Sequence, residues 1–283
     1  MVTLEELGTP RKSTWCPGCG NFGILTAFKN ALIELGVERE QVVIVSGIGC
    51  HGKMVNYVNV NGFHGIHGRV IPLASGIKMA NPGLIVVGFA GDGDCYDEGW
   101  GHFAHGIRRN VDITILVHDN KVFGLTTGQT TSTSEPGFVS KTTPEGSKLP
   151  SLNPIANVIV NHGTFVARGF PGDLAHLKHL IVQAIRHRGF SLIDILQPCV
   201  SFNRVNTYQF YRKRIYKLEE TDHDPADIQQ ALERSFEWGD RIPIGVFYQA
   251  RRATFDETKD HIKSSVALQT GPGEIEQLLR EAG

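Results

Sequence analysis

The sequence has no excess of charge of either sign. It carries 28 lysines and arginines against 29 aspartates and glutamates, which gives a formal net charge of −1 over 283 residues. No global basic field is present to attract nucleic acid, and no acidic tail is seen. We therefore expect no nucleic-acid partner.

The sequence also lacks a long hydrophobic run. No stretch approaches the roughly 20 apolar residues that a membrane span needs. Residues 1–11 carry acids and no apolar segment of the kind that marks a secretory signal. We expect no membrane association and a cytoplasmic location. The five cysteines should then be reduced thiols or metal ligands rather than disulfides.

Short β-branched runs alternate with helical patterns along the chain, and 41% of the residues are hydrophobic, enough for a sizeable core. This alternation predicts an α/β fold, with a parallel sheet and helices on both faces. Residues 124–154 are rich in Thr, Ser, Gly and Pro and are expected to form a long functional loop. The expected strands are 41–46, 84–90, 112–118, 190–196 and 244–249, and the expected helices are 24–35, 97–109, 173–187 and 224–238.

Glycines and polar residues follow three of the expected strands, at Gly49-Cys50, at 91–94 and at Asp119-Asn120. Ligands of parallel sheets sit beyond the carboxyl ends of the strands. The glycines allow a phosphate to approach the backbone closely, while Asp92 and Asn120 offer the oxygen ligands that Mg²⁺ prefers. An ordinary turn would explain Gly-Asp-Gly alone, but Asn120, 28 positions after Asp92, favours a magnesium–diphosphate site.

Four cysteines stand at positions typical of metal ligands. Cys16 and Cys19 form a C-x-x-C unit, Cys50 follows a strand, and Cys199 follows another. A C-x-x-C unit alone fits zinc, an iron–sulfur cluster or a redox dithiol. A redox dithiol is disfavoured because no strand precedes the pair. The usual pattern of a compact zinc ribbon, two neighbouring C-x-x-C units, is absent, because the third and fourth cysteines are single and distant in the sequence. Four thiolates could hold zinc or a [4Fe–4S] cluster about equally well.

The residues Trp-Cys-Pro-Gly-Cys-Gly at 15–20, Gly-Ile-Gly-Cys at 47–50, Gly-Asp-Gly at 91–93 with Asn120, Gly-Leu-Thr-Thr-Gly-Gln at 124–129 and the late Pro198-Cys199 resemble the β subunits of 2-oxoacid:ferredoxin oxidoreductases. The resemblance extends from about residue 14 to 252. It implies thiamine diphosphate held through Mg²⁺ by Asp92, Asn120 and the main-chain carbonyl of Val122. Asp119 departs from the paired asparagines that are usual in the family.

The resemblance also implies the remaining site residues. The [4Fe–4S] cluster would be held by Cys16, Cys19, Cys50 and Cys199. The other contacts with thiamine diphosphate would come from Ile48, Gly49, Cys50, His51, His67, Gly93, Asp94, Gly124 and Leu125. Lys53 and Leu125 would face the substrate, whereas Cys95 is expected to be a small buried side chain.

The implied reaction is a coenzyme-A-dependent oxidative decarboxylation of 2-oxoglutarate, pyruvate or a broad range of 2-oxoacids. It yields acyl-CoA and CO₂, with electrons passing through the cluster to ferredoxin. The chain is long enough for the diphosphate module only, so a separate α subunit is expected to supply the pyrimidine module, in an αβ or (αβ)₂ complex. A non-oxidative thiamine-diphosphate decarboxylase or synthase subunit is the alternative, but it leaves the four cysteines without a shared task.

We expect one thiamine-diphosphate-binding domain over residues 1–283, with a cluster-binding arm at about 1–20 and a C-terminal extension at about 200–283. The extension begins with a basic stretch, 204–217, in which tyrosines are interleaved. Such a stretch can bind nucleic acid, but the net charge favours a solvated or subunit-facing segment. Docking of acidic ferredoxin or of coenzyme A is a further hypothesis for it, to be tested at Arg212 and Arg214.

Overall fold

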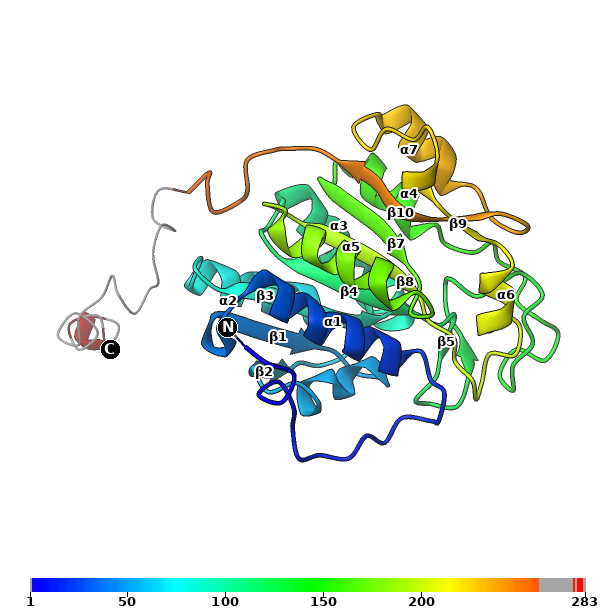
Figure 1. Cartoon of the computed structure of the whole chain (residues 1–283), viewed down its shortest axis with the longest axis horizontal. Helices are drawn as coiled ribbons and strands as arrows, with labels where there is room; N and C mark the ends of the chain where they lie inside the picture. The colour runs from blue at the N-terminus through cyan, green and yellow to red at the C-terminus, as the bar shows by residue number, and fades with distance from the viewer. Residues whose placement is uncertain (1, 260–276, 278, 282–283) are drawn as a thin grey trace.

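The computed structural model describes residues 2–259, 277 and 279–281, and an eight-stranded sheet lies at its centre (Figure 1). The order of strands across the sheet is β2-β1-β3-β4-β8-β7-β10-β9. These strands are β1 (Val42–Ser46), β2 (Asn61–His64), β3 (Ile85–Gly91), β4 (Thr114–Asp119), β7 (Phe165–Gly169), β8 (Ser191–Leu196), β9 (Ile215–Lys217) and β10 (Ile242–Gln249). A separate short hairpin consists of β5 (Val122–Phe123) and β6 (Gln129–Thr130).

The six strands from β2 to β7 are parallel, which confirms the predicted α/β class. One departure is that β10 runs antiparallel to β7, so that the far edge of the sheet is mixed. The three segments predicted at strand ends, at 49–50, 91–94 and 119–120, lie at the ends of the parallel strands β1, β3 and β4. They therefore meet at one edge of the sheet, as parallel topology requires.

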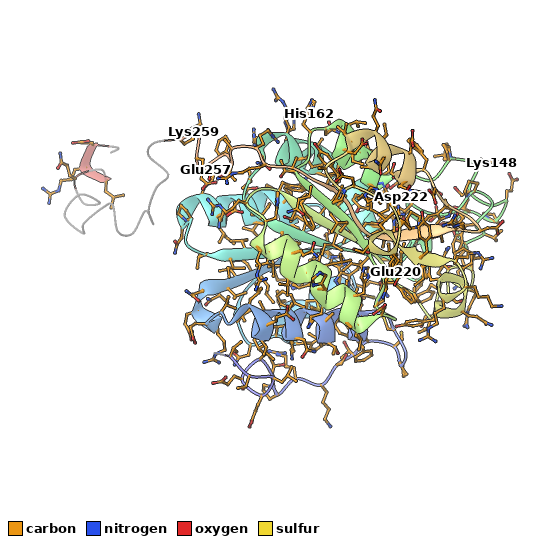
Figure 2. The ribbon with its side chains drawn as sticks, turned by 45° about the horizontal axis from the view of Figure 1, so that its top comes forward. Lys148, His162, Glu220, Asp222, Glu257 and Lys259 are labelled. Carbon is orange, nitrogen blue, oxygen red and sulfur yellow. The ribbon has the colours of Figure 1, made fainter. Side chains whose placement is uncertain are left out.

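Helices cover both faces of the sheet because the buried side chains of each strand alternate between two cores. In β1, Val42 and Ile44 belong to one core, and Val43 and Val45 belong to the other. The first core is covered by α1 (Asn21–Leu35) and α5 (Leu174–Arg186). The second core is covered by α2 (Val70–Ala80), α3 (Trp100–Arg109), α4 (Pro154–Val160) and α7 (Ile228–Ser235). The short helix α6 (Tyr208–Arg212) lies beside a third, smaller cluster. Polar side chains such as those of Lys148 and His162 stand at the periphery (Figure 2).

The helix α1 ends as the sequence predicts, because Gly36 takes the left-handed conformation (φ 67°) that closes a helix. Other elements escape sequence reasoning. β2 is exposed at every position, so it shows no apolar run, and β7 carries the buried Arg168 among its residues. The predicted C-terminal extension includes residues 260–276, 278, 282 and 283, which lie outside the described residues. Among the described residues, no helix is long and apolar enough to span a membrane.

Candidate functional site

Three loops that follow neighbouring strands surround a small cavity of about 60 Å³ at the carboxyl edge of the sheet. The loops follow β1, β3 and β4, which are adjacent in the sheet. All the residues predicted to contact thiamine diphosphate or magnesium line this cavity, which we call the diphosphate cavity. Its lining consists of Ile48, Gly49, Cys50, His51, His67, Gly91, Asp92, Gly93, Asp94, Asn120, Val122, Phe123, Gly124, Leu125 and Thr126.

Asp92 is a buried carboxylate, 1% exposed, at the floor of the diphosphate cavity. Its Oδ2 accepts hydrogen bonds from the hydroxyls of Thr131 (2.6 Å) and Thr133 (2.8 Å). Burial, followed by the charge of Asp119, raises the pKa of Asp92 to about 8. An ionised carboxylate here calls for a cation, and one carboxylate beside the amide of Asn120 suits Mg²⁺, which takes its other ligands from phosphate and water.

Asn120 is fixed by its neighbours on both sides of its amide. Its Nδ2 donates to Gln197 Oε1 (3.0 Å), and its Oδ1 accepts from the backbone N–H of Val122 (3.1 Å). The next residue, Lys121, has a positive φ of 61°, so the chain turns sharply here. This turn places Val122 on the wall of the diphosphate cavity together with Asn120.

Asp94 holds two histidines against the wall of the diphosphate cavity. Its Oδ2 lies 3.2 Å from His51 Nε2, its Oδ1 lies 3.2 Å from His67 Nδ1, and the N–H of Gly68 donates to Oδ1 (2.7 Å). Burial opposes the ionisation of Asp94, but the hydrogen bond and charge of His51, the N–H of Gly68 and the charge of His67 together lower the pKa of Asp94. This group was not predicted as a unit, because its members lie far apart in the sequence and share no motif.

Two glycines allow this close packing. A Cβ on Gly47 would lie 1.9 Å from Asp94 Oδ2, and a Cβ on Gly93 would lie 2.2 Å from Cε1 of Phe123. Only glycine fits at either position without displacing the loop. The glycines of the 47–50 and 91–93 segments are thus required by packing as well as by phosphate approach.

Gly47→Ala is therefore expected to displace Asp94 and to weaken binding of thiamine diphosphate at least about tenfold, with a loss of about 1–3 kcal/mol in the free energy of unfolding because of overpacking. Isothermal titration calorimetry and thermal unfolding would measure the two effects. Gly76→Ala is the matched control, since a Cβ there meets nothing within 4 Å and Gly76 lies inside α2. It should raise stability by roughly 0.5–1 kcal/mol. Unchanged cofactor affinity in the Gly47 variant would contradict the proposed packing.

A second cavity, of about 190 Å³, lies beside the first, and we call it the cysteine cavity. It is lined by all four predicted cluster cysteines. It shares Cys50, Asn120, Gly124 and Leu125 with the diphosphate cavity. Cys95 is absent from both linings and is buried in the second core, as expected. The full lining is Thr14, Trp15, Cys16, Cys19, Cys50, Lys53, Asn120, Gly124, Leu125, Gln197, Cys199, Val200, Ser201 and Phe202.

The N-terminal arm is pinned to this cavity by backbone contacts. The indole N–H of Trp15 donates to the carbonyl of Cys50 (2.7 Å), and the N–H of Gly20 donates to the carbonyl of Pro198 (3.1 Å). These bonds bring Cys16 and Cys19 to the ends of β1 and β8. Three segments distant in sequence thereby contribute thiols to one space.

The chemistry of the thiols suits a metal centre. Burial raises the pKa of Cys19 to about 12 and also raises the pKa of Cys50, so that these thiols stay protonated until a metal displaces the proton. Gln197 Nε2 donates to Cys19 Sγ (3.4 Å), and the hydroxyl of Ser201 donates to Cys16 Sγ (3.0 Å). Hydrogen bonds to sulfur are a known means of tuning iron–sulfur potentials.

Gly124 lies close to two of the thiols, at the wall shared by the two cavities. A Cβ at this glycine would lie 3.8 Å from Cys199 Sγ and 3.9 Å from Cys50 Sγ. Within the described residues, no three or more His, Cys, Asp or Glu side chains converge as ligands of a single metal ion. A single zinc would need its thiolates within about 2.3 Å of one point. In a [4Fe–4S] cluster, by contrast, each thiolate binds a separate iron.

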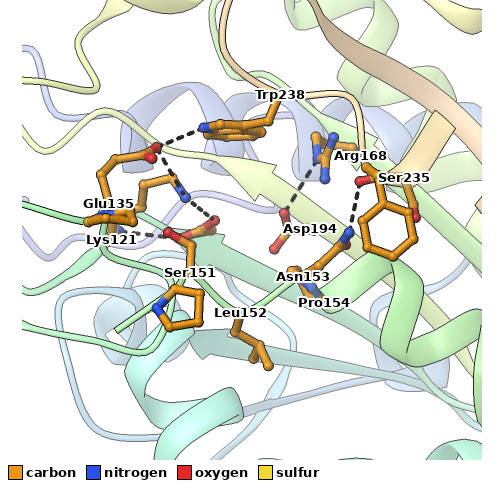
Figure 3. Close-up of a pocket in the computed structure, with 14 residues that line it drawn as sticks. Lys121, Glu135, Ser151, Leu152, Asn153, Pro154, Arg168, Asp194, Ser235 and Trp238 are labelled. Carbon is orange, nitrogen blue, oxygen red and sulfur yellow. Dashed lines mark hydrogen bonds and ion pairs between the residues drawn. The ribbon is translucent and has the colours of Figure 1, made fainter. Parts of the chain in front are cut away.

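A third cavity, of about 320 Å³, is lined by three carboxylates, including Asp119, and by two cations, Lys121 and Arg168 (Figure 3). Lys121 Nζ donates to the carbonyl of Thr133 (2.9 Å), lies 3.8 Å from Asp119 Oδ2 and stands 4.4 Å from the ring centre of Trp238. Arg168 Nε lies 3.7 Å from Asp194 Oδ2. Lys121 thus compensates the charge of Asp119 and helps to anchor the loop that carries Asn120.

The comparisons with known proteins agree with this geometry. Residues 47–195 match the family "Thiamine pyrophosphate enzyme, C-terminal TPP binding domain", and residues 199–264 match the family for the C terminal of the "Pyruvate ferredoxin oxidoreductase beta subunit". A 2-oxoacid:ferredoxin oxidoreductase subunit beta from Sulfolobus sp is 46% identical over 97% of this chain and 93% of its own length. The chain belongs to the family of 2-oxoacid:ferredoxin oxidoreductase β subunits.

Other β subunits of 2-oxoacid:ferredoxin oxidoreductases are similarly close. The subunit beta of the Aeropyrum pernix enzyme 1 is 43% identical over 96% of this chain and 88% of its own. The solved 2-oxoglutarate:ferredoxin oxidoreductase from Magnetococcus marinus has a TM-score of 0.88 and 35% identity over 99% of this chain and 95% of its own. The predicted family, fold class and oxidoreductase activity are thereby confirmed, and the thiamine-binding match supports the predicted cofactor.

Proposed function

We propose that this β subunit, with an α subunit, catalyses the coenzyme-A-dependent oxidative decarboxylation of a 2-oxoacid and passes the electrons to ferredoxin. The observation that carries the proposal is the shared wall of the diphosphate and cysteine cavities, formed by Cys50, Asn120, Gly124 and Leu125. A bound thiamine diphosphate would supply an electron sink for decarboxylation, and a [4Fe–4S] cluster would supply one-electron oxidation. A common wall keeps the two groups adjacent.

The residues of this chain would act as holders and positioners. Asp92, Asn120 and the carbonyl of Val122 would hold Mg²⁺, and Gly93 would let the diphosphate approach the backbone. Asp94 would keep His51 and His67 oriented toward the diphosphate cavity, where Ile48 and Gly49 would contact the cofactor. The cluster would be held by Cys16, Cys19, Cys50 and Cys199, so that the N-terminal arm (about 1–20) and the C-terminal extension (from about 200) adjoin it.

A separate α subunit would complete the cofactor site, as an αβ or (αβ)₂ complex. Exposed apolar side chains in the lining of the diphosphate cavity, on β2 and just after β2 support this. Ile48, Phe63, Ile66 and Leu125 are 38%, 52%, 70% and 49% exposed, and β2, an edge strand, is exposed throughout. Unpaired edges and exposed apolar patches are usually covered by a partner. A cytoplasmic location remains the expected one.

The substrate would be a 2-oxoacid such as 2-oxoglutarate or pyruvate. The Magnetococcus marinus enzyme was solved with 2-oxoglutarate, coenzyme A and succinyl-CoA bound, which supports these substrate classes. The test is to purify the chain anaerobically with its α subunit and to measure viologen reduction with several 2-oxoacids. Reduction that depends on both the 2-oxoacid and coenzyme A is expected. Release of CO₂ without reduction of any acceptor would favour the non-oxidative alternative.

Lys53 is proposed to bind the substrate carboxylate, because its ammonium lies at the edge of the cysteine cavity near the shared wall. Its Nζ now donates to the hydroxyl of Thr14 (2.9 Å). Lys53→Met should raise the KM for the 2-oxoacid by about 10- to 150-fold and should change kcat less. This range corresponds to the loss of one hydrogen bond to a charged group. Lys53→Arg should restore part of the affinity, and Lys12→Met, on the exposed arm, is the control. An unchanged KM in the methionine variant would reject this role.

A further inference from the structure

The turn between Cys199 and Asn206 has inverted polarity. Its asparagines are buried, since Asn203 and Asn206 are each 1% exposed, whereas its apolar side chains Phe202 and Val205 are 38% and 49% exposed. A turn folded for solvent alone would expose its amides and bury its apolar groups. Exposed apolar side chains held outward in this way mark a contact surface.

The inversion is fixed by hydrogen bonds. Asn203 Nδ2 donates to the carbonyl of Asn120 (3.0 Å) and to Asn206 Oδ1 (3.0 Å), and Asn203 Oδ1 accepts from the backbone N–H groups of Val205 (3.0 Å) and Asn206 (2.9 Å). The turn is thereby tied to the loop that carries Asn120. Phe202 lines the cysteine cavity, so the exposed apolar surface begins at the edge of that cavity.

Positive charge surrounds the same edge. Residues 9–19 and 199–217, which supply three of the four cysteines, contain seven lysines and arginines and no aspartate or glutamate, although the whole chain is nearly neutral. Arg204, Arg212 and Lys213 are exposed. Within the described part of the chain, none of these three takes part in a salt bridge of the kind that pairs Lys217 with Asp173.

The helix α6 links this charge to the cysteines. Ser201, in the turn, donates to Cys16 Sγ (3.0 Å), and α6 begins two residues after Asn206. The guanidinium of Arg212 stands 5.6 Å from the ring centre of Tyr208. The turn and α6 therefore run from the cysteine cavity to the exposed Arg212.

We infer that Phe202, Arg204, Val205, Arg212 and Lys213 form the surface on which ferredoxin docks to receive electrons, and we call it the exit surface. The inference rests on the proposed function and locates its last step, the transfer of electrons to ferredoxin, on the surface of this chain. Oxidation of one 2-oxoacid releases two electrons, which leave one at a time and reduce two ferredoxin molecules in turn. Exposed apolar side chains together with exposed cations suit a transient acidic partner, because electron-transfer contacts are small and are steered by charge.

Coenzyme A is also anionic, but it fits this surface less well. A nucleotide needs a concave site that encloses it, whereas the exit surface consists of a turn and a short helix with exposed apolar and cationic side chains. Ferredoxin requires only a surface patch, adjacent to the centre that gives up the electron. The two partners give different results in the test.

The test compares two variants of the complete αβ complex. Arg212→Glu with Lys213→Glu should weaken binding of an acidic ferredoxin at least about tenfold at low salt and should flatten the salt dependence of the Kd. Viologen reduction should be unchanged, because this small acceptor needs no docking surface. The charge-conserving pair Arg212→Lys with Lys213→Arg should bind ferredoxin normally. The control is Arg108→Glu with Arg109→Glu, two exposed residues at the end of α3, on the opposite edge of the sheet.

Calorimetry with oxidised ferredoxin gives the Kd independently of turnover. An unchanged Kd in the charge-reversed complex would overturn the inference, as would a raised KM for coenzyme A alone or a failure to assemble with the α subunit. Absence of viologen reduction in the unmodified complex would instead count against the proposed function. The two failures are therefore distinguishable.

Discussion

Asp92→Asn is expected to abolish magnesium-dependent binding of thiamine diphosphate while leaving the ligand-free complex at least as stable as the unmodified one. The carboxylate is 1% exposed and lies near Asp119, so burial and then this charge raise its pKa to about 8. A carboxyl group whose pKa is raised on folding costs stability progressively as the pH rises from its unfolded value toward 8. A neutral amide avoids that cost but offers Mg²⁺ a poorer ligand.

The affinity for thiamine diphosphate should therefore fall at least about 100-fold. The variant loses a direct metal ligand, which costs more affinity than the loss of a residue that only orients a ligand. After the metal has been removed with a chelator, the Tm of the variant complex should rise relative to that of the unmodified complex as the pH increases from 5 to 8. Asp97→Asn is the matched control, since its carboxylate accepts the N–H of Ser132 (3.2 Å) and lies outside the diphosphate cavity. Retention of the cofactor by the Asp92 variant would show that the metal is held elsewhere.

Removal of two cysteines from the N-terminal arm should have the opposite effect, because it should abolish binding of the iron–sulfur cluster and leave binding of thiamine diphosphate intact. Cys16→Ala with Cys19→Ala removes half of the proposed thiolates, and it should lower iron from about four per chain to well under one and abolish ferredoxin reduction. Thiamine diphosphate should still bind, because neither cysteine lines the diphosphate cavity. Iron and cofactor analysis of anaerobically purified complex measures both quantities.

Cys95→Ala is the control for this pair. Cys95 is 3% exposed and packs in the second core, so its loss should leave the iron content unchanged and cost only the stability of a small cavity. Full iron in the double variant would mean that the arm does not hold the centre. Loss of iron in the Cys95 variant would mean that the wrong set of thiols has been assigned.

The sequence predicts the diphosphate cavity well because its parts sit at strand ends. Asp92 and Asn120 follow neighbouring buried strands, and parallel topology alone brings them together. The same rule places Cys50 at this edge. Cys199 follows β8, which is also parallel. Cys16 and Cys19 are different, because no strand precedes them and only the resemblance joined them to Cys50. The contacts of Trp15 and Gly20 that do so physically involve backbone groups.

What could not be predicted depends on contacts without sequence periodicity. Thr131 and Thr133 lie in the long loop, and nothing in its composition indicates that they fold back onto Asp92. The compensation of Asp119 by Lys121 likewise depends on a positive φ and on the ring of Trp238 far along the chain. The last strand was predicted at 244–249, but the antiparallel direction of β10 was not, because an apolar run does not reveal the direction of a strand.

Substrate-dependent reduction of the cluster tests most directly whether the two cavities work as neighbours. An anaerobic αβ complex with thiamine diphosphate and Mg²⁺ would be mixed with a 2-oxoacid and frozen for electron paramagnetic resonance. The signal of a reduced [4Fe–4S] cluster should then appear, at up to about one spin per β chain, and the Asp92→Asn complex should give none. A complex that decarboxylates the 2-oxoacid while its cluster stays oxidised, or that contains zinc and no iron, would contradict the account.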